Sequence, residues 1–215
     1  MRERSQRFDP RQTMQTDTFE VFHYKEPRPA TVEVHHHDFY EVYFLLGGQV
    51  EYWVEGRILR PIAGDLLLIN PMELHRPMIH PESPTYERIV LWINKAYLEG
   101  LTEDGQLSRC FDPSLPNLIR PTAAERTALT AWLSNLVRES YSRDFCSEYS
   151  AFGIFLQFMV QLNRIALHTQ PQQEETAVSN LVDQVLHYIG RHINEELTLD
   201  GLAERFFVSK YHLSH

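Results

Sequence analysis

The spacing of apolar residues changes near Pro121, and this change constrains the fold class more than any other feature of the chain. Residues 19–94 contain short runs with alternating apolar positions, separated by turns, which is typical of antiparallel strands. After Pro121 apolar residues recur three or four positions apart, which is typical of helices. A block of strands followed by a block of helices predicts an α+β fold.

Turn residues divide the first block into strands. Gly47-Gly48 predicts a hairpin because both residues tolerate positive φ. Gly56-Arg57 and Gly64-Asp65 predict two further turns. Buried strands are expected at Leu66–Ile69, which Asn70-Pro71 closes, and at Tyr86–Ile93. Short strands at this spacing predict a closed barrel or a sandwich.

The second block predicts two helices. Thr122 and Glu125 form a capping box, in which each side chain satisfies a free amide at the helix start. Ser147 is a candidate cap for a second helix that runs to about His168. That helix is apolar on nearly all sides, so it needs cover on more than one side. The interpretations are burial within one chain and, preferred here, contact between the subunits of a homodimer.

Composition narrows the class of protein and its location. The 215 residues carry a formal net charge of −9, which argues against a nucleic-acid binder that uses its whole surface. Cys110 and Cys146 lack metal-ligand spacing and indicate a reducing compartment. The N-terminal residues contain no apolar segment typical of a signal peptide, and no apolar run approaches the roughly 18 residues of a membrane helix. A cytoplasmic protein without a membrane partner is expected.

A group of histidines marks the candidate site. Residues two apart on a strand share a face, so His35 and His37 can converge while His36 points away. Glu41 and His75 could join them from neighbouring strands. Three imidazoles and a carboxylate form a possible ligand set for a divalent transition metal.

The spacing of His35, His37, Glu41, Gly48, Gly64 and His75 resembles the paired motifs of the cupin superfamily. The resemblance implies a cupin-like β-barrel of the double-stranded β-helix, or jelly-roll, type. It implies a metal less strongly, because many cupin-like sensor domains keep such histidines without holding an ion.

The histidine group has three interpretations: a metal-free effector pocket, a metal that helps to bind the effector, or a structural hydrogen-bond network. The metal-free pocket is preferred, with no cofactor and no catalytic residue. Its expected lining is His35, His37, Glu41, His75, Tyr43 and Trp53. In the metal interpretation His35, His37, Glu41 and His75 are the ligands.

The C-terminal residues have the pattern of a helix-turn-helix. Thr198 can cap the first helix, Ala203 is small where two helices approach closely, and Ser209 can cap the second helix. Outward-facing residues near the start of the second helix are nearest to DNA. The expected DNA-binding residues are Ser209, Lys210, Tyr211 and Ser214.

Two sets of segments together resemble AraC-type transcription regulators. The sensor part is represented by residues 37–41, 64–71 and 73–77, and the DNA-binding part by residues 193–199 and 209–214. In that family the barrel usually binds a small effector. The family pattern continues beyond His215, so we expect a truncated DNA-binding domain that holds DNA weakly or not at all.

The resulting organisation has five parts: a polar tail (1–18), the cupin-like effector-binding barrel (19–95), a connection with antiparallel dimerisation helices (96–170), a linker (171–177) and the incomplete helix-turn-helix domain (178–215). The predicted function is effector-responsive, sequence-specific DNA binding, with a sugar or related metabolite as one effector class. The alternatives are a metal-dependent cupin enzyme acting on a small substrate and a stand-alone ligand-binding module.

Overall fold

The computed structural model describes residues 8, 11–27, 32–80, 83, 85–169, 181, 185, 188–189, 192 and 197–214. The linker predicted at 171–177 lies outside these residues. So does most of the helix expected between the linker and the helix-turn-helix.

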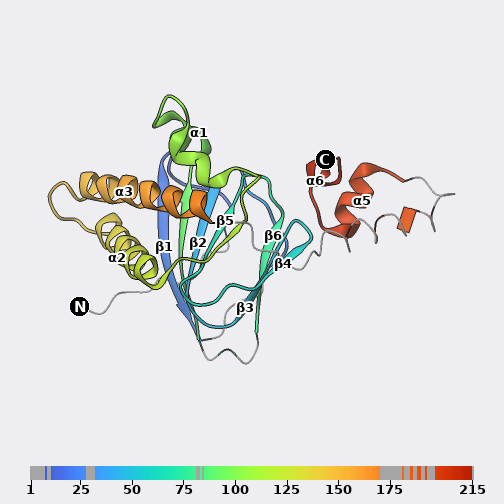
Figure 1. The fold of residues 1–215 in the computed structure, drawn as a ribbon, viewed down its shortest axis with the longest axis horizontal. Helices are drawn as coiled ribbons and strands as arrows, with labels where there is room; N and C mark the ends of the chain where they lie inside the picture. Colours follow the sequence, from blue (N-terminus) through green and yellow to red (C-terminus); the bar gives the residue numbers. More distant parts are fainter. Residues whose placement is uncertain are drawn as a thin grey trace.

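Two antiparallel sheets face each other and form a β-sandwich, which confirms the predicted strand-rich architecture (Figure 1). This two-sheet unit is the barrel of the chain. One sheet has five strands in the order β1-β7-β2-β5-β8, and the other has three in the order β4-β3-β6. The strands are β1 (Phe19–Glu26), β2 (Tyr40–Gly47), β3 (Val50–Val54), β4 (Arg57–Leu59), β5 (Leu66–Ile69), β6 (His75–Ile79), β7 (Tyr86–Ile93) and β8 (Leu118–Ile119).

Helices lie on both outer sides of this sandwich. On one side α2 and α3 cover the five-stranded sheet, and on the other α5 and α6 lie beyond β4 and β6 (Figure 1). The helices are α1 (Lys95–Gly100), the short 3-10 helix η1 (Gln106–Phe111), α2 (Ala123–Ser140), α3 (Ser147–His168), α5 (Leu199–Phe206) and α6 (Lys210–Ser214).

The hairpin predicted at Gly47-Gly48 is wrong. Gly47 ends β2, and Gly48 and Gln49 join it to β3, which belongs to the other sheet, so the connection is a corner between the two layers. Gly48 has a φ of 106°, and a Cβ atom there would lie 2.6 Å from the carbonyl oxygen of Thr85. The glycine is required by this close approach of two backbones.

The second predicted turn exists, but it lies one residue earlier. β3 and β4 pair through Val54 and Arg57, so the two-residue loop is Glu55-Gly56. Both residues have positive φ, at 44° and 79°. This is the pattern of a type I′ turn, whose twist matches that of the paired strands.

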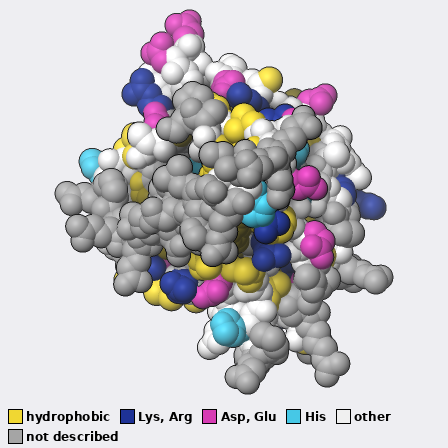
Figure 2. Space-filling view, turned by 90° about the vertical axis from the view of Figure 1, so that its right-hand side faces the viewer, with side chains coloured by type: hydrophobic (Ala, Val, Ile, Leu, Met, Phe, Trp, Pro, Cys, Tyr) yellow, Lys and Arg dark blue, Asp and Glu magenta, His cyan; other side chains and the backbone are white. Residues whose placement is uncertain are grey.

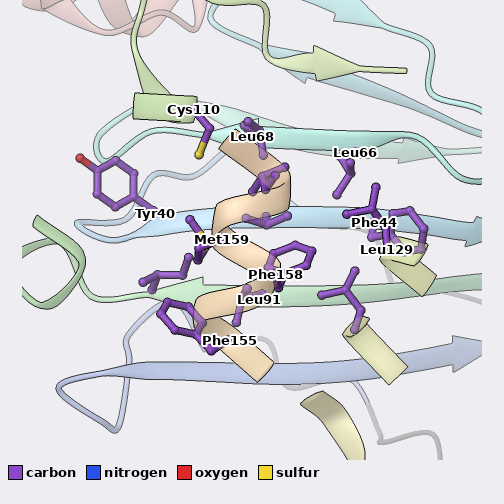
Figure 3. Close-up of a cluster of buried hydrophobic side chains, with 14 of the residues drawn as sticks. Tyr40, Phe44, Leu66, Leu68, Leu91, Cys110, Leu129, Phe155, Phe158 and Met159 are labelled. Atoms are coloured by element: carbon purple, nitrogen blue, oxygen red, sulfur yellow. The ribbon is translucent and has the colours of Figure 1, made fainter. Parts of the chain in front are cut away.

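Both faces of the five-stranded sheet are buried. Successive side chains on a strand point to opposite sides, so each strand contributes to both faces. One face packs against α2 and α3 through residues such as Phe44, Leu66 and Leu91 (Figure 3). The other face packs against the three-stranded sheet through residues such as Tyr43 and Leu45. Two separate apolar cores therefore share one sheet.

The predicted helix starts had different outcomes. The capping box at Thr122 is confirmed, since its hydroxyl accepts from the Glu125 amide and the Glu125 carboxylate accepts from the Thr122 amide. The cap predicted at Ser147 is wrong. Cys146 occupies the N-cap position in the left-handed conformation, with no side-chain cap bond, and Ser147 is already helical.

Helix α3 is long and apolar enough to cross a membrane by length and composition alone, contrary to the sequence expectation. Its position favours a core helix instead, because Phe155, Phe158, Met159 and Leu162 are fully buried. The opposite side of α3 is open in this single chain: Phe152 and Val160 are each 36 % exposed. Within the described part of the chain, the cover of α3 is therefore incomplete.

Replacing Phe158 with alanine should lower the free energy of unfolding by about 3–5 kcal/mol, because it empties a fully buried position between α3 and the sheet. Urea denaturation followed by circular dichroism measures this loss. Phe145 is 98 % exposed, so Phe145→Ala serves as the control and should change stability by no more than about 0.5 kcal/mol. Equal losses in both variants would contradict the assigned core.

Candidate functional site

A pocket of about 280 Å³ lies between the two sheets. Strand β7 forms one wall, because alternate residues of a strand share a face and Tyr86, Arg88, Val90 and Trp92 all point inward. The remaining lining comes from β1, β2, β3, β6, the segment before β2 and the N-terminal segment. Those residues are Tyr24, Glu41, Tyr43, Tyr52, Pro77, Val32, Glu33, His35, His37, Phe8, Arg11 and Gln12.

The histidines of this site share one orientation. In His35, His37 and His75, Nδ1 donates to the carbonyl oxygen of Glu33, Phe39 and Glu73 respectively, at 2.8–2.9 Å. Such a bond places the proton on Nδ1 and leaves the Nε2 lone pair available. Within the described part of the chain, Nε2 of His37 and Nε2 of His75 are buried without a hydrogen-bond partner.

Glu41 lies at the centre of the group. Its carboxylate accepts hydrogen bonds from Trp92 Nε1 at 2.8 Å and from the Tyr52 hydroxyl at 3.3 Å. His37 Nε2 lies 3.5 Å from the same carboxylate. Burial alone raises the pKa of Glu41, but the His37 and His75 imidazoles and the Trp92 N–H lower it to about 2. Glu41 is therefore a buried carboxylate that stays ionised at neutral pH.

His75 contacts His35 and His37 but does not itself line the pocket, so that part of the predicted lining is wrong. It is fully buried, and burial lowers its pKa to about 3. It is therefore neutral at pH 7. His35 lies at the rim of the pocket, where a pair of backbone hydrogen bonds joins it to His75. Burial also lowers the pKa of His35.

Three of the four predicted cluster residues converge tightly. Candidate ligand atoms of His37, Glu41 and His75 lie within 4.8 Å of one another. The His35 ring centroid is 4.3 Å from that of His75 and 6.3 Å from that of His37, so His35 borders the group. His36 is exposed and points away, as the strand alternation predicts.

Of the two aromatic residues predicted to line the pocket, one does and one does not. Tyr43 lines the pocket, and its hydroxyl lies 2.8 Å from that of Tyr86. Trp53 does not line the pocket, so that prediction is wrong. It follows Tyr52 on β3, and the two-residue alternation turns it to the outer face, where it meets Phe207 edge to face.

Sequence reasoning missed several lining residues. The alternation from Tyr86 to Trp92 along a predicted strand could have identified the β7 wall. The contribution of Phe8 and Arg11 could not be found that way, because the first 18 residues are polar and carry no periodicity. In the structure Phe8 lies edge-on to Tyr24, and Arg11 lies over the Phe22 and Trp92 rings.

Both arginines of the pocket have carboxylate partners. Arg88 donates to Glu26 at 3.1 Å and stacks over the ring of Tyr86 at 4.3 Å. Arg11 pairs with Glu20. The positive charge on the pocket wall is thus already compensated, and the polar groups facing the cavity are mainly phenols, imidazoles and the Glu41 carboxylate.

The C-terminal helices have the expected caps. The Thr198 hydroxyl accepts from the Gly201 amide, and the Ser209 hydroxyl accepts from the His212 amide. Tyr211 is 68 % exposed, and exposed Lys210 forms an ion pair with Asp200. The side chain of Ser214 lies outside the described part. The DNA-binding role of these residues stays a prediction.

The family of the chain follows from a match over most of its length. A family model described as the AraC-like ligand binding domain matches residues 18–151. The matched region includes both sheets, helix α2 and the start of α3. The chain therefore belongs to the family of AraC-like ligand-binding domains. No curated protein matches its sequence.

Solved structures give low overall similarity. The AraC-like transcriptional activator CuxR is 14 % identical, with a TM-score of 0.44 over 90 % of this chain and 65 % of that chain. The DMSP lyase DddQ from Ruegeria pomeroyi DSS-3 is 23 % identical, with a TM-score of 0.33 over 37 % of this chain and 40 % of that chain. An RmlC-like cupin with a double-stranded β-helix fold from Methanocaldococcus jannaschii is 16 % identical, with a TM-score of 0.34 over 43 % of this chain and 92 % of that chain. This chain spans less than two thirds of the first two proteins.

Replacing Glu41 with alanine should destabilise the protein, because the Trp92 N–H and the Tyr52 hydroxyl would both lose their buried acceptor. Each unsatisfied donor costs about 1–3 kcal/mol. Urea denaturation at pH 7 measures the change. Glu33→Ala is the control, because Glu33 is exposed at the rim. An unaltered unfolding midpoint in Glu41→Ala would contradict the buried network.

Proposed function

We propose that this chain is the sensing part of a transcription regulator that binds DNA in response to a small effector. The observation that carries the proposal is the pocket between the two sheets, in a chain that belongs to the AraC-like ligand-binding domains. The capped helix pair α5–α6 supports the proposal of a DNA-reading role, because two short helices joined by a short turn are typical of a helix-turn-helix. A cytoplasmic location is part of the proposal, since the regulator must reach DNA.

The proposed effector is a small, uncharged molecule with several hydroxyl groups, such as a sugar. A cavity of about 280 Å³ is near the lower end of ligand pockets. Aromatic side chains offer ring faces to C–H groups, while Glu41, His35 and the tyrosine hydroxyls offer hydrogen bonds. Because Glu26 and Glu20 already pair with the two arginines, an anionic effector is disfavoured.

We also propose that the regulator is a homodimer joined through α3. Four large apolar side chains form a stripe on the side of α3 that faces away from the sheet. They are Tyr149, Phe152, Val160 and Leu167, which are 68 %, 36 %, 36 % and 52 % exposed. Their spacing keeps them on one helix face, and an isologous contact between two such faces would cover them.

The α5–α6 unit by itself is expected to hold DNA weakly. Acidic Asp200 and Glu204 accompany basic Arg205 and Lys210. Figure 2 views the molecule from this side, and basic and acidic side chains are interspersed around the described part of that face. Phosphate contacts from several basic groups supply most non-specific affinity, so this unit requires a larger DNA-binding surface.

Effector binding should depend on His37. A thermal-shift screen against neutral sugars and related polyols should raise the melting temperature of the wild-type chain with one ligand class, because a ligand that binds the native state stabilises it. His37→Ala should weaken that ligand at least tenfold, about 1.4 kcal/mol in binding free energy. His36→Ala is the matched control, because His36 is exposed. Equal affinity in both variants would exclude the pocket as the effector-binding site.

Dimerisation should depend on the apolar stripe. Phe152→Glu and Val160→Glu each place a charge in the proposed contact, and light scattering after size exclusion should show a change from dimer to monomer. Phe145→Glu is the control, because Phe145 precedes α3 and lies outside the stripe. A wild-type chain that is monomeric at high micromolar concentration would contradict the proposed homodimer.

A metal-dependent function is the second candidate, and one observation favours it. The buried Nε2 atoms of His37 and His75 point toward the Glu41 carboxylate with their Nδ1 protons fixed by carbonyl groups, as in metal-binding histidines. These residues could hold a divalent transition metal, which would act as a Lewis acid toward a small substrate. Elemental analysis of the purified wild-type and His37→Ala proteins tests this: near-stoichiometric metal lost in the variant favours it, and no metal in the wild type removes it.

A further inference from the structure

The turn between β3 and β4 connects the barrel to the C-terminal helices through one carboxylate. Glu55 Oε1 accepts from the Leu74 amide at 2.9 Å, and Glu55 Oε2 accepts from the Ser209 amide at 2.9 Å. Leu74 precedes β6, and Ser209 precedes α6. Glu55 is 4 % exposed, so this bridge is shielded from water.

The turn itself does not account for a glutamate at this position. Glu55 has a φ of 44°, a left-handed conformation in which asparagine or glycine is preferred. Burying a carboxylate also costs free energy unless hydrogen bonds compensate. The two backbone amides provide that compensation, and one of them belongs to the C-terminal unit.

Apolar packing surrounds the same contact. Val208 is 1 % exposed, and its Cγ1 would lie 3.4 Å from a Cβ atom at Gly56. Phe207 meets the outer face of Trp53 edge to face, with 6.4 Å between ring centroids. The contact between the barrel and the α5–α6 unit therefore combines a buried charge with apolar burial.

The contact is also adjacent to the pocket. Tyr52, three residues before Glu55, donates to the pocket carboxylate Glu41. Val54 pairs with His75, and the Glu55 amide donates to the carbonyl oxygen of Leu74. One hairpin thus has pocket residues on its inner face and the C-terminal contact on its outer face and turn.

We propose that Glu55 is an intramolecular latch that holds the α5–α6 unit on the barrel and couples it to the start of β6, where His75 contacts the pocket residues His35 and His37. Because one carboxylate bonds both Leu74 and Ser209, a shift of the β6 start beside His75 changes the bond to α6. This inference rests on the proposed function for its regulatory meaning, but the latch itself can be tested without an effector or DNA.

The test is hydrogen exchange of the complete 215-residue chain, with mass spectrometry of peptides covering 73–79, 86–93 and 199–214. The main variant is Glu55→Asn, because Asn-Gly is a preferred type I′ pair and the barrel turn should remain intact. Glu55→Gln is the second variant, which keeps the length but removes the charge. Glu51→Gln is the matched control on the same strand, since Glu51 pairs with Arg60 and lies outside the contact.

Exchange in 199–214 should rise at least about tenfold in Glu55→Asn, the size expected for losing a hydrogen bond to a charged group. Exchange in 73–79 should rise with it, and β7 should stay protected. Glu55→Gln should fall between wild type and Glu55→Asn, and Glu51→Gln should match wild type.

Unchanged exchange in 199–214 in both Glu55 variants would overturn the latch. A rise in 199–214 without one in 73–79 would overturn the coupling to the pocket. If the latch is confirmed but no effector stabilises the chain, the proposed function fails while the latch remains.

Discussion

The five-stranded sheet is buried on both faces, and the rest of the structure depends on this constraint. On β7, residues 87, 89, 91 and 93 alternate with residues 86, 88, 90 and 92. The apolar members of the first set pack against the helices, and the second set forms the wall of the pocket. A slip of one residue in the register would exchange the two sets. Fixing the helix-facing core therefore also fixes the geometry of the pocket.

Strand positions could be predicted from the sequence because alternation and turn residues are local signals. The bounds of β5 and β7 were predicted to the residue. Strand pairing was harder, because pairing is decided by contacts far apart along the chain. At Gly47-Gly48 the local pattern is the same for a hairpin and for a corner between sheets, and only the approach of Thr85 distinguishes them.

The site was predicted in part for the same reason. The two-residue period of a strand predicted that the side chains of His37, Glu41 and His75 could converge, and they do. Trp53 was misplaced although the two-residue alternation of β3 puts it on the same outer face as Glu51, because its aromatic side chain suggested a pocket wall. Arg88 pairs with Glu26 across 62 positions of sequence. The sequence around a charged residue in a strand does not indicate whether its side chain faces a pocket.

The β3–β4 hairpin has two roles, because it lines the pocket and also contacts the C-terminal helices. Its inner face supplies Tyr52 to the pocket, while its outer face and turn contact the C-terminal helices. An effector can change the state of those helices only by its differential affinity for two arrangements of the barrel. A hairpin with both contacts is suited to this, because a small shift at β6 would alter the Glu55 carboxylate bonds without unfolding the sheet. The left-handed conformation of Glu55 costs free energy, and the connection between the barrel and the α5–α6 unit explains why a glutamate stands there.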